Sequence, residues 1–376
     1  MEFQGIAKAA DFLDDFVVYR RLEPADSRLP GLGSLAAELG LAVGMPPRKN
    51  EREYARVIAC ILDAARTLEG GSLHELLYIG DSPLDGQAFT NLLGERDWLG
   101  RAFIGRDTLS VEPTLKMDGL LCFSNRWGNL PEFLRMARRD GFRLDTSSAV
   151  VVDLDKTLLG PRGRNDTTID GARSQAAIRV AQHVLRDATA HAEFSRVYRE
   201  MHQPKYHFFT GDNQDYLVYC ALMIAAGVYS LPALQDDLAT RKICSFSDFV
   251  ALVDRELSRR TTPALSVIQR EVFENLQAGD PTPFKSFRRE EYLTTVGRMG
   301  GTAPRMDIKA VLEDRITLNY EVVQLLQYVK RRGVLALALS DKPDEAVFPT
   351  DDLVIRGYRP LHHVETLMVG EDLNWV

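Results

Sequence analysis

Residues 149–157 read AVVVDLDKT, and this stretch decides the fold. It contains a short apolar run, Ala149–Val152, that ends directly in a carboxylate, Asp153. Two further runs are of the same kind: Leu76–Ile79 is followed by a glycine and an acid, and Val334–Leu339 is followed by Ser340. Short apolar runs bounded by turn residues are typical of strands in a parallel sheet that is covered on both faces. The three runs therefore predict three buried strands that lead into polar residues.

A segment with helical periodicity precedes each predicted strand. These segments are Glu51–Leu68, Leu130–Asp140 and Tyr320–Arg332. Gly141 and Gly333 follow the last two, at the position where glycine commonly ends a helix. Alternating helices and buried strands indicate an α/β fold with a doubly wound, mostly parallel sheet. Ligands of such folds bind outside the carboxyl ends of the strands, which is where the polar residues fall.

Between the second and third predicted strands the pattern changes to helices alone. We therefore expect a helical insertion over residues 166–312, carried by an α/β core made of residues 1–165 and 313–376. A further helix is expected near the N-terminus, at about Ile6–Arg20. The helices predicted in the insertion are Arg173–Leu185, Tyr216–Tyr229, Phe246–Leu257 and Ala264–Leu276, and its polar candidates are Asp212–Asp215 and Lys285–Arg289.

The composition is that of a globular chain. Of 376 residues, 45% are hydrophobic and 26% are charged, and 53 acidic against 46 basic residues give a formal charge of −7. No block of Lys and Arg is present that could neutralise phosphates, so no nucleic-acid partner is expected. The most apolar stretch, Val218–Leu234, is interrupted by Pro232 and predicts a buried helix, so no membrane partner is expected either.

The four cysteines, Cys60, Cys122, Cys220 and Cys244, are scattered and show no spacing typical of a metal site. They predict reduced, buried thiols. The N-terminal residues lack the basic and apolar regions of a signal peptide, so we expect a cytoplasmic location. The sequence leaves the oligomeric state open.

Two pairs of carboxylates follow predicted strands. Asp153 and Asp155 stand two residues apart, and like charges this close raise each other's pKa unless a cation intervenes. Asp81 and Asp85 stand four residues apart, and Pro83 between them suits the first turn of a helix, so both can project to one side. Hard carboxylate oxygens at strand ends suit Mg²⁺. The alternative for the second pair is that Asp81 only caps a helix.

Three further polar residues complete the candidate set. Ser340 ends its strand and offers a hydroxyl and a backbone amide at the same sheet edge. Lys49 precedes the helix that leads to the Asp81 strand, where it can neutralise a phosphoryl oxygen, and Arg48 beside it is a rival for this role. Thr157 completes the pattern D-x-D-x-T that begins at Asp153.

Together these residues resemble the four motifs of the haloacid dehalogenase superfamily, most of whose members are Mg²⁺-dependent aspartyl phosphatases. The matches are D-x-D-x-T at residues 153–157, Ser340 after a second strand, Lys49 ahead of a helix, and G-D-x-x-x-D at residues 80–85. The resemblance covers the α/β part of the chain and not the helical insertion.

The order of the motifs departs from that of the family. Its members usually run nucleophile, Ser or Thr, Lys, acidic pair, whereas this chain runs Lys49, acidic pair, D-x-D, Ser340. The resemblance therefore implies a circularly permuted core. In such a core the Ser340 strand lies beside the Asp153 strand, and the two chain ends lie close together on its surface.

The resemblance implies a role for each matching residue. Asp153 is expected to form an aspartyl-phosphate, and Asp155 to protonate the leaving oxygen and then activate water. Ser340 and Lys49 are expected to bind the phosphoryl group, and the Leu154 carbonyl to join the metal ligands. The predicted catalytic residues are Asp153, Asp155, Thr157, Ser340 and Lys49, and the predicted Mg²⁺ ligands are Asp153, Asp155, Asp81 and Asp85.

The expected activity is hydrolysis of a small phosphorylated metabolite, with the helical insertion as a cap that excludes water and selects the substrate. A phosphotransferase or phosphomutase that uses the same aspartyl-phosphate, and a catalytically idle relative that binds a ligand, remain alternatives. The D-K-T at residues 155–157 also resembles the phosphorylation site of P-type ATPases, in which Asp155 would be the nucleophile. Because the apolar strand ends at Asp153 and Leu158 follows in place of Gly, the sequence favours Asp153.

Overall fold

The computed structural model describes residues 1–41, 46–258, 263–300 and 307–375. The chain divides into two compact units: a core unit of Met1–Gly171 and Thr295–Val376, and a helical unit of Ala172–Thr294. The predicted boundaries, 165/166 and 312/313, lie outside these limits. The observed boundaries, Gly171/Ala172 and Thr294/Thr295, fall inside the helices α6 (Asp166–Val184) and α13 (Lys285–Arg298). A helical pattern alone does not tell which unit a helix packs against, so the sequence assigned too much to the insertion.

Among the described residues, seven strands form the main sheet of the core unit, in the order β2-β9-β7-β3-β4-β6-β5. Neighbouring strands are parallel except for β5 and β6. The three predicted strands are the neighbours β9, β7 and β3, and the prediction of an α/β fold with a mostly parallel sheet is confirmed. The strands are β2 (Val17–Val18), β3 (Glu75–Gly80), β4 (Leu99–Gly105), β5 (Leu115–Asp118), β6 (Leu121–Ser124), β7 (Ser148–Asp153) and β9 (Leu335–Leu339).

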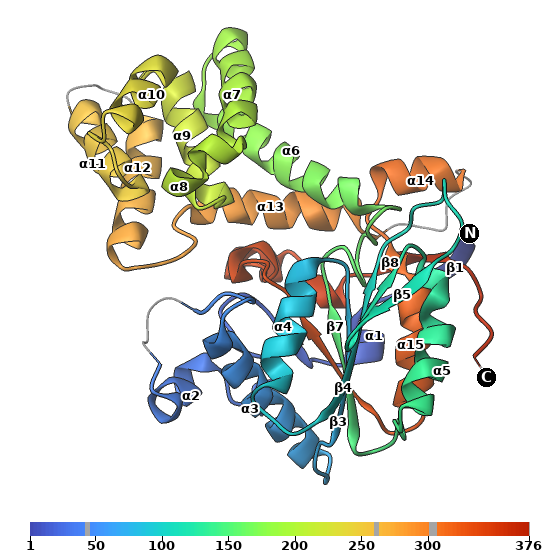
Figure 1. The fold of residues 1–376 in the computed structure, drawn as a ribbon. Coiled ribbons are helices and arrows are strands. Elements are labelled where there is room, and N and C mark those ends of the chain that lie inside the picture. Colours follow the sequence, from blue (N-terminus) through green and yellow to red (C-terminus); the bar gives the residue numbers. More distant parts are fainter. Residues whose placement is uncertain (42–45, 259–262, 301–306, 376) are drawn as a thin grey trace. The chain divides into compact units, whose positions relative to one another are not determined.

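Helices cover both faces of this sheet (Figure 1). Tyr78 and Val151 point from neighbouring strands into one apolar cluster with α2, α3 and α4. On the opposite face, the ring of Phe103 packs edge-on against Phe133 of α5, with the ring centroids 5.4 Å apart. The helices of the core unit are α1 (Ala10–Leu13), α2 (Leu32–Leu39), α3 (Arg52–Leu68), α4 (Pro83–Leu93), α5 (Leu130–Arg139), α14 (Ile308–Asp314), α15 (Tyr320–Lys330) and α16 (Asp351–Ile355). Gly141 and Gly333, which follow α5 and α15, have the positive φ that ends a helix.

The two ends of the chain meet in a second, smaller sheet. β1 (Glu2–Ala7) pairs antiparallel with β10 (Thr366–Gly370), which pairs parallel with β8 (Leu318–Asn319). The Met1 amino group lies 3.6 Å from the Glu371 carboxylate, so the chain ends are close together as predicted. The predicted helix Ile6–Arg20 is wrong, because α1 is its only helical part in these fully described residues. Pairing of β1 with β10 and of β2 with β9 draws the flanking residues into strands.

The helical unit has its own apolar core. α9 is buried from Leu217 to Ile224, so the first part of the apolar stretch is a buried helix as predicted. Edge-on aromatic contacts of Tyr219 with Phe246 and Phe249 join α9 to α11. In the part of the chain that the structure describes, no helix has the length and apolar character needed to cross a membrane. The remaining helices are α7 (Ala188–Met201), α8 (His207–Thr210), α9 (Gln214–Ala225), α10 (Leu231–Ala239), α11 (Phe246–Leu257) and α12 (Pro263–Gln277).

The two polar segments singled out in the insertion bind each other. Arg288 Nη2 lies 2.5 Å from Asp215 Oδ2, and Arg288 Nη1 lies 2.6 Å from Glu291 Oε2. The backbone N–H of Phe284 donates to the other oxygen of Asp215 at 3.0 Å. All three charged side chains are buried. They therefore join α9 to α13 within the helical unit. Their charges neutralise one another and have a structural role in that unit.

All four cysteines are free thiols. Cys122 and Cys220 are buried as predicted, and Cys60 is partly buried. Cys244 is exposed, so the prediction of a buried thiol is wrong there. It lies directly before Ser245, whose capping box with Asp248 begins α11 at the surface.

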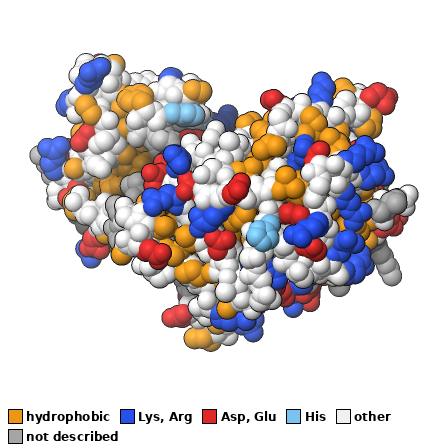
Figure 2. All heavy atoms as spheres, turned by 60° about the horizontal axis from the view of Figure 1, so that its bottom comes forward, with side chains coloured by type: hydrophobic (Ala, Val, Ile, Leu, Met, Phe, Trp, Pro, Cys, Tyr) orange, Lys and Arg blue, Asp and Glu red, His pale blue; other side chains and the backbone are white. Residues whose placement is uncertain are grey.

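Charged side chains of both signs mix on the surface. Figure 2 shows one face of the molecule, on which acidic and basic side chains are interspersed and the basic ones gather along one edge. A typical exposed pair is Arg135 with Glu132 in α5, whose Nη2 and Oε2 atoms lie 2.7 Å apart. Water screens such pairs, so each contributes little to the free energy of unfolding.

Arg164, in contrast, is a buried cation that joins distant parts of the core unit. Its guanidinium lies 2.7 Å from the Asp107 carboxylate and 2.9 Å from the Glu321 carboxylate, and it donates to the Val369 carbonyl at 3.1 Å. The three side chains are each no more than 3% exposed. The loop after β7 is thereby tied to α15 and β10, which links the main sheet to the small one.

Replacing Arg164 by Met is expected to lower the free energy of unfolding of the core unit by about 3 to 5 kcal/mol, because it leaves two buried carboxylates without their cation. Denaturant unfolding followed by circular dichroism measures this loss. Arg135→Ala, which breaks the exposed pair in α5, is the control and is expected to change the value by less than about 1 kcal/mol. Equal effects of the two substitutions would contradict the structural role of Arg164.

Candidate active site

The candidate site lies at the carboxyl edge of the main sheet. β3 and β7 pair in parallel, so Asp81 after β3 and Asp153 at the end of β7 leave the sheet at the same edge. β7 and β9 also pair in parallel, with Asp153 opposite Leu339, and this register brings Ser340 beside Asp153. Parallel pairing of three buried strands therefore gathers polar residues that are far apart in the sequence.

Lys49 connects two of the acids. Its Nζ lies 2.5 Å from Asp85 Oδ1 and 2.5 Å from Asp153 Oδ1, and all three side chains are buried. Burial disfavours the charged ammonium, but Asp153 and Asp85 outweigh this and raise the pKa of Lys49 above its usual value. Arg48, the sequence rival, uses its backbone N–H to bond Glu51 at 3.0 Å, on the exposed side of the turn. Lys49, and not Arg48, is therefore the cation that lies between Asp85 and Asp153.

Asp85 is held on all sides by protein donors. Its Oδ2 accepts the backbone N–H groups of Asp81 and Ser82 and the Ser82 hydroxyl, which forms the capping box that begins α4. The alternative that Asp81 only caps a helix is therefore wrong, because Ser82 and Asp85 together cap the N-terminus of α4. A Cβ on Gly80 would lie 2.4 Å from the Asp85 Cβ, so the turn between strand and helix requires glycine there. These bonds and Lys49 lower the pKa of Asp85 despite its burial.

Asp81 pairs with a residue that the sequence did not single out. Arg162 Nε, from the loop after β7, donates to Asp81 Oδ2. Burial and the neighbouring Asp85 charge nevertheless raise the pKa of Asp81 to about 6. Arg162 does not come directly after a strand, and it belongs to no motif that the sequence analysis used. It reaches the site because the loop after β7 folds back. Its carbonyl accepts the Asp107 N–H at 2.9 Å, which helps to fix that loop.

Asp81, Asp85 and Asp153 form a buried acidic cluster that can hold a metal ion. One carboxylate oxygen from each lies within 4.8 Å of the others. Burial, with the charges of Asp85 and Asp81, raises the pKa of Asp153 well above its usual range, although Lys49 opposes this. A divalent cation would relieve the repulsion. The donors are all hard oxygens, which fit Mg²⁺ better than the softer transition metals.

Asp155 lies outside this cluster. Asp155 was predicted to be a metal ligand, but the structure does not group it with the three acids that could hold the ion. Its carboxylate, 24% exposed, lies 3.9 Å from the Nζ of Lys342, whose side chain is buried. Lys342 is a second residue that was not among the predicted site residues; it stands two positions after Ser340. The structure brings it beside Asp155 through the turn after β9.

Ser340 keeps only part of the role expected of it. Its backbone N–H donates to the Val18 carbonyl at 3.0 Å, so the amide is consumed by the edge strand β2. Its hydroxyl accepts the Lys342 N–H at 3.1 Å and retains its own hydrogen for donation. The side chain is buried at the same edge as Asp153. The hydroxyl, and not the amide, is the group that Ser340 offers a ligand.

Thr157 closes the turn that follows the two acids. Its carbonyl accepts from Asn319 Nδ2 at 3.0 Å, which fastens the turn to β8. Its hydroxyl is fully buried and has no partner among the described residues. Lys156 beside it has a positive φ of 65°, and its N–H donates to the Leu159 carbonyl at 2.7 Å. The backbone is thus tightly turned directly after Asp155.

No family model, no curated protein and no solved structure matches this chain. What the site can do therefore has to follow from its own residues.

Replacing Asp81 by Asn is expected to stabilise the metal-free protein at neutral pH. The pKa of Asp81 is about 6 in the folded state against an ordinary 3.8, so the folded state favours the neutral carboxyl. Its ionisation therefore costs stability as the pH rises from about 4 through 6, by at most about 3 kcal/mol above that range, and nothing below it. Denaturant unfolding in the presence of chelator is expected to show a gain for Asp81→Asn at pH 7.5 that shrinks toward pH 4.

Two controls separate this effect from a general one. Asp118→Asn, at an exposed position of β5, is expected to leave stability unchanged at both pH values. Added Mg²⁺ is expected to raise the melting temperature of the parent and to raise that of Asp81→Asn much less, because a carboxylate ligand is missing. A variant that is less stable than the parent at pH 7.5 would contradict the electrostatic account of the cluster.

Proposed function

We propose that the protein is a Mg²⁺-dependent phosphomonoesterase that acts on a small phosphorylated metabolite through an aspartyl-phosphate on Asp153. The observation that carries the proposal is the convergence of Lys49, Asp85 and Asp153, from three separate segments, within hydrogen-bond distance at a strand edge. Phosphoryl transfer needs a positioned nucleophile and neutralised oxygens more than it needs covalent machinery. A buried acidic cluster with a fixed ammonium meets both needs.

The metal would be held directly by Asp81 and Asp153, and Asp85 would support the site without ligating the metal directly. Asp85 suits this indirect role because protein donors already engage both of its oxygens. Bound Mg²⁺ supplies positive charge that neutralises the phosphoryl oxygens in the transition state. Lys49 is already placed to add a second positive charge beside the nucleophile. The Ser340 hydroxyl can donate a hydrogen bond to a third phosphoryl oxygen.

Asp153 is the nucleophile in this proposal. Lys49 holds its Oδ1, so Oδ2 is the oxygen that attacks phosphorus while the bond from phosphorus to the leaving oxygen breaks. Asp155 gives its proton to that leaving oxygen. In the second half, Asp155 removes a proton from a water molecule, the water oxygen bonds to phosphorus, and the bond to Asp153 Oδ2 breaks. Inorganic phosphate leaves and both carboxyl groups regain their starting states.

Asp155 suits the acid–base role because it is less tightly held than the other acids. It is partly exposed, and its nearest cation, Lys342 Nζ, is 3.9 Å away. The rival assignment makes Asp155 the nucleophile, by likeness to P-type ATPases. The position of Asp155 outside the metal-binding cluster argues against it, since the attacked phosphate must bridge nucleophile and metal.

The circular permutation and the cap also belong to this proposal. Support for the permutation comes from β9, which lies beside β7, and from β1 and β10, which join the chain ends. In the proposed enzyme the helical unit is the cap that selects the substrate. The phosphotransferase alternative uses the same Asp153 chemistry and differs only in the acceptor of the phosphoryl group.

A phosphate-release screen over a panel of phosphorylated metabolites with Mg²⁺ tests the proposal. The parent is expected to release phosphate from at least one of them, and excess chelator to abolish the release. Asp153→Asn is expected to lower turnover by about 10³-fold or more, because an amide of nearly the same shape is not a nucleophile. Full activity of this variant, or full activity in chelator, would contradict the proposal.

The variant Asp155→Asn distinguishes the two assignments of the nucleophile, Asp153 or Asp155. With p-nitrophenyl phosphate, whose leaving group needs no proton, this variant is expected to form the phosphoenzyme and to hydrolyse it slowly. Intact-mass measurement detects the added phosphoryl group, and peptide mapping is expected to place it on Asp153. A phosphoryl group on Asp155 in the parent would establish that Asp155, and not Asp153, is the nucleophile. Formation of a phosphorylated alcohol from added acceptors would identify a phosphotransferase.

A further inference from the structure

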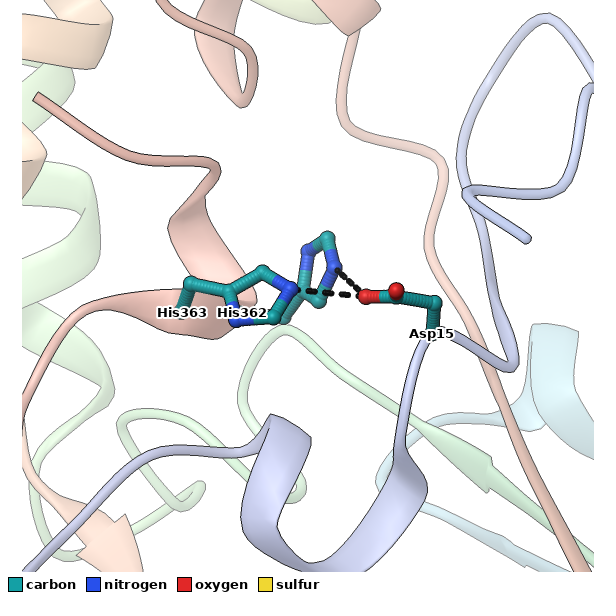
Figure 3. Close-up of side chains that lie close together, drawn as sticks. All are labelled: Asp15, His362 and His363. Atoms are coloured by element: carbon teal, nitrogen blue, oxygen red, sulfur yellow. Dashed lines mark hydrogen bonds and ion pairs between the residues drawn. The ribbon is translucent and has the colours of Figure 1, made fainter. Parts of the chain in front are cut away.

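A second cluster of metal-binding side chains shares no residue with the acidic cluster and lies where the two ends of the chain meet. Asp15 stands between α1 and β2, and His362 and His363 belong to the short 3₁₀ helix η4 (Leu361–His363). The Nε2 atoms of His362 and His363 lie 3.1 Å and 2.7 Å from the same oxygen, Asp15 Oδ1 (Figure 3). The proposed phosphatase chemistry uses none of these residues.

The convergence of the two rings is unusual for neighbours in the sequence. Successive residues of a 3₁₀ helix stand about 120° apart around its axis, so adjacent side chains normally diverge. Here the ring centroids of His362 and His363 are 4.5 Å apart, and both rings point toward Asp15 (Figure 3). His362 is buried, with its ring against those of Tyr19 and Phe348. Packing thus fixes at least one ring in this direction.

The hydrogen bonds suit a metal-binding histidine. Nδ1 of His362 lies 3.1 Å from the Tyr19 hydroxyl, which can donate to it or accept from it. When Nδ1 carries the proton and donates to Tyr19, Nε2 presents a lone pair toward Asp15. Metal-binding histidines commonly have an outer partner of this kind on the second nitrogen.

We propose that Asp15, His362 and His363 form a binding site for a divalent transition-metal cation of the Zn²⁺ type. Two imidazole nitrogens and one carboxylate oxygen are a donor set that Zn²⁺ takes in three-ligand sites, where water fills the fourth position. Metal–ligand distances of about 2.0 to 2.2 Å place the ligand atoms of a tetrahedral site about 3.3 to 3.6 Å apart. The present separations of 2.7 and 3.1 Å need only a small opening. The side chains of Asp15 and His363 are 48% and 38% exposed, so the ion and its water can reach them.

The two clusters differ in the ions they favour. The acidic cluster offers oxygens alone, which suit Mg²⁺, whereas imidazole nitrogens favour Zn²⁺, Co²⁺ and similar ions. A bound ion would also join Asp15 to His362, which are 347 residues apart in the sequence. Because the unfolded chain does not keep these ligands together, binding stabilises the folded state. This site therefore acts as a clip between the chain ends, whether or not the protein is a phosphatase.

Zn²⁺ binding to the full chain tests the site, in an Asp81→Asn background that weakens the acidic cluster. Competition with a chromophoric chelator is expected to show one tightly bound Zn²⁺, and added Zn²⁺ is expected to raise the melting temperature. Co²⁺ in its place is expected to give the intense visible absorption of a tetrahedral centre. His363→Ala and Asp15→Asn are each expected to weaken Zn²⁺ binding about tenfold or more.

His74→Ala is the matched control, since His74 is an exposed histidine of the same unit whose side chain bonds only Ser72 among the interactions found in the described residues. It is expected to bind Zn²⁺ as the background does. His363 is chosen over the buried His362 because its removal endangers the fold least, and circular dichroism without metal verifies this. Unchanged Zn²⁺ affinity of His363→Ala would overturn the proposal, as would loss of all Zn²⁺ binding in the Asp81→Asn background.

Discussion

One buried cation organises the carboxyl edge of the sheet. Lys49 lies between Asp85 and Asp153, and each of these side chains is almost wholly removed from water. Two carboxylates that close would repel strongly in an interior of low dielectric constant, whereas an ammonium between them forms two charge-assisted hydrogen bonds. The three residues come from the turn before α3, the start of α4 and the end of β7. Parallel pairing places β3 and β7 at this edge, and the close approach of the Asp85 and Asp153 carboxylates depends on one ammonium group.

The same edge holds more acid than its cations satisfy. Lys49 and Arg162 face Asp81, Asp85 and Asp153, and the pKa values of Asp81 and Asp153 are raised by burial and by the neighbouring charges. A fold selected for stability alone would not keep three buried carboxylates within 4.8 Å. Perturbed carboxylates at a strand edge are typical of functional sites, where charge is arranged for a ligand that the folded chain lacks. The excess of acid is thus the physical reason to expect a cation here.

The sequence predicted the central strands because each is a continuous apolar run with a polar residue after it, and burial on both faces produces this pattern wherever the strand lies. It predicted Asp81 and Asp153 together for the same reason, since parallel strands bring their ends to one edge. Lys49 follows no strand and was predicted from its place ahead of the helix that leads to the Asp81 strand. The two-residue strand β2 carries no such signal, and its residues were assigned to a helix. Arg162 was missed because a fold-back of the loop after β7 places it, and no local pattern encodes that loop.

The chain ends have a part in the site although they lie far from its acids in the sequence. Ser340 is held in place by the bond from its N–H to the Val18 carbonyl, so its position depends on the edge strand β2. Two residues are too few to hold a strand by their own pairing. The residues before β2 add further contacts, because Asp15 binds His362 and His363 and β1 pairs with β10. Contacts between the two ends of the chain therefore help to set the position of Ser340, at the sheet edge where Asp153 ends its strand.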